Sequence, residues 1–561
     1  MRGEPVVVLL SAMAVAAAMR ERLPALSVDA AALVAVAVCA ALLDVRRGGA
    51  QNSAFGFRKG AGSGLSLGLT TVPCTLVAVL LSAPHGSAED ARLVRALLHA
   101  SLASSSAVLY ALARGSLNVR AAPFAQARVA LVASALAALV FPATPTPLVL
   151  GASVATEPVV RLLLSRLRGS FSLGEAATVA QAAALLAVDV GLLLGCRGGA
   201  LDGGALCARH DVVLVVAEVG LACALLLGPW LAAALAAADA HAARGGRART
   251  RGVGGDEEGG AVVYAALGAF LVLVLYPALR VALGAPPVDW LCSFLLARPV
   301  RLALLGYWLA LAAAGTALIS AVRTRMPLIL VRKLYHALAV LLFLPAMLVE
   351  LQLMRLAFAV AIALLLALEY VRVARAPPLA RPLSAFLRRY TDARDAGPLI
   401  TTHIYLLLGC ALPVLATPSA APSIGQTAQP AVVLPPMAGI LALGVGDSMA
   451  SYVGVRFGRT RWPGTAKTVE GTAAAVGAIV VGAGALCAAS AAVAPARGDR
   501  GDDASAALGV LGATIATCVL EAVTDQIDNL FLPLHYFCAL RVALGAPVYG
   551  GVEARMSRPG E

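Results

Sequence analysis

The residues best suited to chemistry lie in one polar stretch, residues 444–472, which separates two long apolar runs of the chain. The stretch reads GVGDSMASYVGVRFGRTRWPGTAKTVEGT. It holds acids at Asp447 and Glu470 and five glycines between residues 446 and 471. Its basic residues are Arg456, Arg459, Arg461 and Lys467. Because Lys and Arg both bind phosphate groups, this combination in an apolar chain predicts a site for a polyanionic ligand.

Phosphoryl transfer needs cations for the phosphates, metal ligands, close approach of the backbone and a base for the acceptor hydroxyl. Lys467 and Thr468 precede an apolar run that begins at Val469, so we expect them at a helix N-terminus, where backbone N–H groups favour anions. The glycines that permit close approach are Gly446, Gly454, Gly458, Gly464 and Gly471. The carboxylates suited to Mg²⁺, which prefers oxygen ligands, are Asp447, Glu470, Asp525 and Asp528.

Several of these features also have a simpler explanation. A basic cytoplasmic loop often only fixes topology or contacts anionic lipid, which accounts for the arginines of residues 372–394 and partly for those of 456–461. It does not account for acids at the membrane boundary. His336 can be an ordinary interfacial residue, and the sequence lacks both G-x-x-x-x-G-K-[ST] and a G-x-G-x-x-G after a strand. The residues alone indicate a membrane enzyme that handles a phosphorylated nucleotide or lipid.

The composition identifies a polytopic membrane protein. Of the 561 residues, 60% are hydrophobic and 13% are charged, whereas soluble domains are about half apolar and about a quarter charged. A spanning helix needs about 20 apolar residues, and the sequence offers roughly fifteen such runs. We therefore expect an all-α transmembrane bundle of roughly fifteen spans. The net charge of +13 does not indicate nucleic-acid binding, since the sequence contains no soluble basic domain.

The chain divides at residues 240–260, which are rich in Gly and Arg and lack apolar periodicity. We expect them to form a disordered linker. It follows an N-terminal multispan region at 1–239 and precedes connecting spans at 261–320. The catalytic region is expected at 321–549, and a polar tail follows at 550–561.

Counting spans through the C-terminal half places four polar clusters on one side of the membrane. The positive-inside rule makes that side cytoplasmic. Lysine is rare in this chain, and Lys333 and Lys467 both fall within these clusters, whereas Lys59 does not. The clusters are residues 332–336, 372–394, 447–470 and 521–528.

Six blocks of the sequence resemble the dolichol kinase family, which belongs with the polyprenol and phytol kinases and is distantly similar to phosphatidate cytidylyltransferases. The resemblance extends over about residues 321–540, and the N-terminal half is similar only as a hydrophobic multispan region. The blocks are VRKLYH at 331–336, LEYVRVARAPPL at 368–379, DARDAGPLITTHIYLLLG at 392–409, GVGDSMASYVG at 444–454, RWPGTAKTVEGT at 461–472 and LEAVTDQIDNLFLPL at 520–534.

The resemblance implies transfer of the γ-phosphate of CTP to the terminal hydroxyl of dolichol, which supplies dolichyl phosphate for protein glycosylation. The family's CTP-binding signature reads D-x-x-A-x-x-x-G-x-x-x-G and then K-K-T-x-E-G. Ala466 replaces the first Lys of the second part, so either Arg459 or Arg461 compensates beside Lys467 or nucleotide affinity is reduced. The matching positions are Asp447, Ala450, Gly454, Gly458, Lys467, Thr468, Glu470 and Gly471.

The resemblance also implies roles for single residues. Lys467 is expected to contact the phosphates. Asp447 and Glu470 are expected either to hold Mg²⁺ or another divalent cation or to contact the nucleotide, and Asp528 is a further expected metal ligand. Asp525 or Asp528 is expected to accept the dolichol proton, with His336 as the alternative base.

The expected partners are dolichol or a related polyprenol, CTP and membrane lipids, with no nucleic acid and with the oligomeric state left open. The expected location is the endoplasmic reticulum membrane, as a multi-pass protein whose active face is cytoplasmic.

Other functions remain open at this stage. One is a kinase for another isoprenoid alcohol, and a second is a CTP-using cytidylyltransferase. A third, a membrane transporter, would be expected to have paired broken helices in inverted halves. The two halves of this sequence do not mirror each other in that way.

Overall fold

The computed structural model describes residues 3–46, 57–58, 61–82, 88–113, 146–199, 211–244, 253–322, 325–326, 328–388, 395, 397–418, 429–493 and 503–545. Apart from one isolated β-bridge between Arg461 and Thr468, these residues form helices and the segments that connect them. The expected all-α architecture is therefore confirmed for the described part of the chain.

The helices of the N-terminal half are α1 (Glu4–Arg22), α2 (Ser27–Arg46), α3 (Leu65–Ser82), α4 (Ala88–Ala113), α6 (Thr146–Arg166), α7 (Leu173–Arg197) and α8 (Val212–Arg244), with a short 3₁₀ turn η1 (Pro24–Leu26). The middle of the chain forms α9 (Val253–Phe270), the π-helix η3 (Leu271–Leu275), α10 (Tyr276–Leu283), α11 (Pro287–Leu296) and α12 (Pro299–Val322).

The C-terminal half begins with α13 (Leu328–Val349), α14 (Leu351–Val373), α15 (Ala380–Leu387) and α16 (Thr401–Leu415). It continues with α17 (Pro430–Val433), η7 (Pro435–Met437), the π-helix η8 (Ile440–Asp447), α18 (Ser448–Phe457), α19 (Val469–Val493), α20 (Asp503–Val523) and α21 (Asp528–Leu544).

Among the described residues, 10 helices are long and apolar enough to cross a membrane. Large apolar side chains on these helices are exposed, for example Leu309 at 76% and Val481 at 72%, which is the exposure that lipid-facing positions require. The structure therefore supports a polytopic membrane protein, but it does not confirm a number near fifteen.

The expected linker at 240–260 is shorter than its composition indicates. Helix α8 continues to Arg244, and α9 begins at Val253. Residues 240–244 read AHAAR, and because Ala and Arg are strong helix formers they extend α8 despite the lack of apolar periodicity. Residues 245–252 lie outside the described part, as do residues 389–394 of the basic loop and the expected tail at 550–561.

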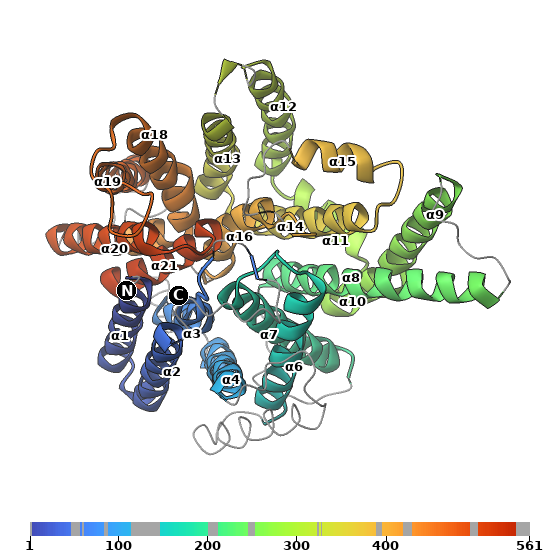
Figure 1. The fold of residues 1–561 in the computed structure, drawn as a ribbon, viewed down its shortest axis with the longest axis horizontal. Helices are drawn as coiled ribbons and strands as arrows, with labels where there is room; N and C mark the ends of the chain where they lie inside the picture. The colour runs from blue at the N-terminus through green and yellow to red at the C-terminus, as the bar shows by residue number, and fades with distance from the viewer. Residues whose placement is uncertain are drawn as a thin grey trace, which may run out of the picture.

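The last helix, α21, joins the two halves of the molecule. One hydrophobic core combines Val8 of α1 and Leu69 of α3 with Phe531 of α21. A second core combines Phe358 of α14 with Phe537 on the same helix α21. Figure 1 accordingly shows the first helices, drawn in blue, beside the red helices α20 and α21. The N-terminal and C-terminal halves therefore share a packed interior.

The apolar run that leads to Asp447 is not one continuous α-helix. Pro435 and Pro436 begin a 3₁₀ turn, because proline lacks the N–H that a helix interior requires. A π-helix of eight residues, η8, then ends at Asp447. Because π-helical turns are wider than α-helical ones and often occur at functional sites, this geometry marks Asp447 as a position of interest.

Candidate active site

The loop between α18 and α19, residues 458–468, carries most of the predicted phosphate-binding residues and is held by hydrogen bonds between its two ends. The amide of Val469 donates to the Thr460 carbonyl oxygen at 2.9 Å, and the amide of Trp462 donates to the Lys467 carbonyl oxygen at 3.0 Å. The Glu470 carboxylate accepts the Thr460 amide at 2.9 and 3.1 Å. These hydrogen bonds to Glu470 hold the start of the loop against the first turn of α19.

The signature glycines pack α18 against α19. A Cβ atom on Gly458 would lie 2.6 Å from the Thr468 side chain just before α19, and one on Gly471 would lie 2.7 Å from the Ala450 carbonyl oxygen of α18. Small residues at such positions let membrane helices approach closely. The packing explains these glycines without a ligand, whereas Gly464, at φ +74°, has open space around its Cβ position.

Thr468 belongs to the same contact. Its hydroxyl oxygen accepts the Gly471 amide at 3.2 Å and so satisfies one of the free N–H groups at the start of α19. On the loop, Arg459, Arg461 and Ala466 are exposed. The position at which the family usually carries its first lysine is therefore on the surface, next to two arginines that can replace its charge.

Two lysines pair with carboxylates from distant parts of the chain. Lys333 of α13 places its Nζ atom 2.5 Å from Asp447 Oδ2, with side-chain exposures of 15% and 12%. Lys467 donates from Nζ to the Glu521 carbonyl oxygen at 2.6 Å and lies 3.4 Å from Glu521 Oε1. These two pairs bring three of the four predicted polar clusters together.

The pairs belong to one electrostatic cluster. Asp447 interacts with Lys333, His336 and Lys467. Glu521 interacts with Lys467, Asp447 and also with Asp528. The site thus combines α13, the end of η8, the α18–α19 loop, the end of α20 and the start of α21.

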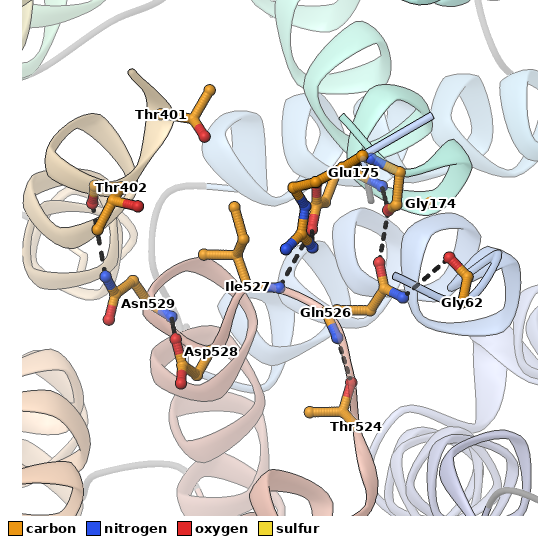
Figure 2. A network of polar contacts seen from close by, with 12 residues as sticks. Gly62, Gly174, Glu175, Thr401, Thr402, Thr524, Gln526, Ile527, Asp528 and Asn529 are labelled. Atoms are coloured by element: carbon orange, nitrogen blue, oxygen red, sulfur yellow. Dashed lines mark hydrogen bonds and ion pairs between the residues drawn. The ribbon is translucent and has the colours of Figure 1, made fainter. Parts of the chain in front are cut away.

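The two candidate bases on the α20–α21 connection have different surroundings. Asp528 begins α21 and accepts its neighbour's amide at 3.0 Å (Figure 2). It also interacts electrostatically with Glu521. Asp525 instead interacts with Glu4 of α1. Asp528 is thus a like-charged neighbour of Glu521 in the lysine cluster, whereas the Asp525 backbone lies beside Glu4 of α1.

Arg372 of the fourth polar cluster is connected through Glu369 to the start of α16. Arg372 donates to Glu369 at 2.6 and 2.7 Å, and Glu369 accepts the Ile400 amide at 2.7 Å. Asp395 accepts the amides of Thr401 and Thr402 at 3.0 and 3.2 Å and so caps α16. These residues of the family-like blocks position the helix that packs against α21.

The predicted metal ligands are not gathered into a metal-binding cage. Among the described residues, no group of three or more His, Cys, Asp or Glu side chains is arranged to hold a metal ion. Glu470 faces the Thr460 amide, whereas Asp447 and Asp528 belong to the lysine cluster. Mg²⁺ in nucleotide enzymes is commonly held by one or two carboxylates and the substrate phosphates, a requirement that Asp447 and Asp528 fit.

Sequence reasoning did not include Lys333 and Glu521 among the site residues. The signal for Lys333 was its rarity, because this chain has only three lysines, of which two now lie in one cluster. Glu521 had a weaker signal as an acid at the end of an apolar run. Its partner Lys467 lies 54 residues away in the sequence, so only the fold reveals the pair.

Comparison with known proteins gives one family. Residues 259–490 match the family described as dolichol kinase. The chain is 39% identical over 259 residues to the dolichol kinase EVAN of Arabidopsis thaliana. It is 36% identical over 277 residues to the dolichol kinase of Homo sapiens and 35% identical over 192 residues to that of Saccharomyces cerevisiae.

These alignments cover 45%, 48% and 34% of this chain and 43%, 50% and 34% of the three relatives. The matched part therefore spans half or less of the length of these curated relatives. The family match includes Lys333, His336, Asp447 and Lys467, whereas Glu521 and Asp528 lie beyond residue 490. No solved structure matches the chain.

Proposed function

We propose that this chain, whose residues 259–490 match the dolichol kinase family, phosphorylates the terminal hydroxyl of dolichol with CTP as the phosphate donor. The product is dolichyl phosphate, the lipid carrier used in protein glycosylation. The observation that carries the proposal is the cluster of Lys333, Lys467, Asp447 and Asp528, which unites charges from four separate segments. Transfer to a long lipid alcohol suits a site built at the ends of membrane helices.

In the proposed reaction, the dolichol hydroxyl oxygen forms a bond to the γ-phosphorus of CTP, and the bond from that phosphorus to the β,γ-bridging oxygen breaks to release CDP. Lys467 and Lys333 stabilise the negative charge on the phosphates, since ammonium groups are effective point-charge partners of phosphate. Asp447, held between these lysines, fixes their positions. Mg²⁺, when bound with the nucleotide, would supply further charge neutralisation on the phosphate oxygens.

Asp528 is the favoured base in this reaction. It neighbours Glu521, the carboxylate that pairs with Lys467, whereas Asp525 neighbours Glu4 of α1. A base must lie within hydrogen-bond reach of the proton that it accepts, so Asp528 is better placed than Asp525. His336, an electrostatic neighbour of Asp447, is the second candidate.

We further propose that the protein resides in the endoplasmic reticulum membrane with its site on the cytoplasmic face, where CTP is available. The candidate spans support a multi-pass arrangement. The exposed arginines around the site, Arg456, Arg459 and Arg461, support the cytoplasmic orientation through the positive-inside rule.

The test is an assay with purified protein, dolichol and CTP labelled at the γ-phosphate. Label in the lipid supports the kinase, and label in released pyrophosphate with CMP retained on the lipid identifies a cytidylyltransferase instead. Replacement of dolichol by a shorter isoprenoid alcohol tests the choice of acceptor. If no isoprenoid alcohol becomes labelled, the proposed kinase activity is wrong.

A further inference from the structure

The segment that leads from α20 to Asp528 is only partly held by backbone hydrogen bonds to the adjoining helices, at Thr524 and at Ile527. Helix α20 ends at Val523 and α21 begins at Asp528, so residues 524–527 form a non-helical connection. Thr524, Gln526 and Ile527 are nevertheless buried. Buried polar groups need partners. The Ile527 amide and the side chains of Thr524 and Gln526 find partners in the N-terminal half of the chain, two of which, Glu175 and Gly62, are drawn in Figure 2.

The first partner is the carboxylate of Glu175, at the start of α7. Its Oε1 atom accepts the Ile527 amide at 3.1 Å and also accepts from the guanidinium of Arg58. Its Oε2 atom accepts the Ser172 amide at 2.9 Å. The Arg58 and Glu175 side chains are 2% and 0% exposed. One buried ion pair thus supplies the acceptor for a backbone amide next to Asp528.

The second contact is made by the side chain of Gln526. Its Oε1 atom accepts the Ser172 hydroxyl at 2.5 Å, and its Nε2 atom donates to the Gly62 carbonyl oxygen at 3.4 Å. The space is tightly filled, because a Cβ atom on Gly64 would lie 2.2 Å from the Gln526 amide carbon. Gly64 has φ +60°, a conformation that glycine adopts without strain.

A third contact comes from α1. The Thr524 hydroxyl donates to Glu4 Oε2 at 2.7 Å and also accepts the Gln526 amide at 3.1 Å. On the opposite side, Asn529 donates to the Thr402 carbonyl oxygen of α16 at 3.5 Å. Three separate pieces of the N-terminal half therefore fix the connection before α21 begins.

We propose that the N-terminal half is the support that positions Asp528 for phosphoryl transfer, and that Glu175, paired with Arg58, is the positioning residue. This inference rests on the function proposed above. A buried ion pair gives little net stability, because desolvation of both charges offsets their attraction. The contribution of the Arg58–Glu175 pair is to positioning, because Glu175 accepts the backbone amide of Ile527, the residue before Asp528.

The test replaces the ion pair by apolar residues of similar volume, in the double variant Arg58→Met, Glu175→Leu. Such replacement of a buried pair is often neutral for stability, but it removes the acceptor of the Ile527 amide. The matched control is Arg161→Met, Glu157→Leu, which removes another buried Arg–Glu pair of the N-terminal half, within α6. A second test variant, Gln526→Leu, removes the contacts to Ser172 and Gly62 without touching a charge.

Two measurements are made on full-length protein in detergent. Amide hydrogen exchange of residues 520–530 is expected to be faster in both test variants and unchanged in the control. In the labelled-CTP assay, kcat is expected to fall by about ten- to a hundred-fold in the Arg58, Glu175 variant, because small misplacements of catalytic groups are costly. KM for CTP should not change, since the lysine cluster stays intact.

Unchanged exchange in both test variants, or an equal loss of kcat in the control, would overturn the inference. Faster exchange throughout the protein would show that the Arg58–Glu175 pair stabilises the whole fold, and it too would overturn the inference. If the wild-type protein phosphorylates no lipid, the proposed function fails, while the exchange measurement still decides whether the N-terminal half holds the connection.

Discussion

At the scale of single residues, the two lysines of the cluster have different surroundings. Lys333 pairs directly with Asp447, so its charge is balanced within the protein. Lys467 is bound mainly by a backbone carbonyl oxygen, and its side chain is 29% exposed. A backbone carbonyl orients an ammonium group without neutralising it, so Lys467 is the lysine better able to accept phosphate charge.

Lys467→Ala is expected to lower CTP-dependent phosphorylation by at least about a hundred-fold, the effect typical of removing one group that stabilises transition-state charge. Membrane insertion should be normal. The labelled-CTP assay on equal amounts of membrane-inserted protein measures the loss. Arg459→Ala, on the exposed part of the same loop, is the control and should lose less. Near-normal activity of Lys467→Ala would exclude Lys467 from the site.

Lys333→Met is expected to destabilise the protein by about 3–5 kcal/mol, because it leaves the buried carboxylate of Asp447 without its partner. Lys333→Met, Asp447→Asn removes both charges and should recover most of that stability. Thermal unfolding midpoints in detergent measure the difference. Activity is expected to remain lost in the double variant. If the single and double variants melt alike, the pair is not coupled in the folded protein.

At the scale of helices, the glycines of the CTP-binding signature can serve nucleotide binding or helix packing, and the structure shows a packing role. The resemblance assigns Ala450, Gly454 and Gly458 to the CTP-binding signature. In the folded chain Ala450 and Gly454 lie on α18 and Gly458 directly follows it, and all three lie against Thr468 or Gly471 at the start of α19. The helix contact in turn holds the loop that carries Lys467.

Gly471→Ala is expected to lower the thermal midpoint of ligand-free protein, because its Cβ atom would collide with the Ala450 backbone. Overpacking of this kind costs about 1–3 kcal/mol. Gly477→Ala is a matched control in the same helix, since nothing lies within 4 Å of its Cβ position. The control should be neutral or stabilising. A normal midpoint for Gly471→Ala, combined with weaker CTP binding, would favour direct phosphate contact instead.

The sequence predicts the membrane helices better than it predicts the contacts within the site. The apolar run that begins at Val469 predicted the start of α19, because a membrane-spanning helix is dictated by local composition. The turn at Pro435–Met437 and the π-helix η8 were missed, since the run around them is uniformly apolar. Partners such as Lys333 and Asp447, or Glu175 and Ile527, are far apart in the sequence, so no local pattern could pair them.

At the scale of the whole molecule, the shared interior changes the meaning of the N-terminal half. The sequence indicated only a hydrophobic multispan region there. The structure places its buried polar groups, including Glu4 and Glu175, against the connection that leads to Asp528. The family match, which starts at residue 259, omits this support.

The proposed orientation predicts which loops face the cytoplasm. Cysteine introduced by Gly464→Cys, in the α18–α19 loop, should react with a membrane-impermeant thiol reagent in sealed microsomes. Gly284→Cys, in the turn between α10 and α11, should react only after detergent is added, because α12 separates the two ends of the bundle. Both are made with Cys292→Ser, which removes an exposed thiol. Equal labelling of the two positions before detergent would contradict the orientation.

The position of α21 also has a consequence for biosynthesis. This helix leaves the ribosome last among those described, yet its neighbours α1 and α3 leave among the first. The contacts that α1 and α3 make with α21 must therefore stay unmade until α21 itself has been synthesised. A nascent chain stalled before residue 528 would carry Lys333 and Lys467 but neither Asp528 nor the helix that contributes to both cores, so the proposed site is assembled only after α21 has been made.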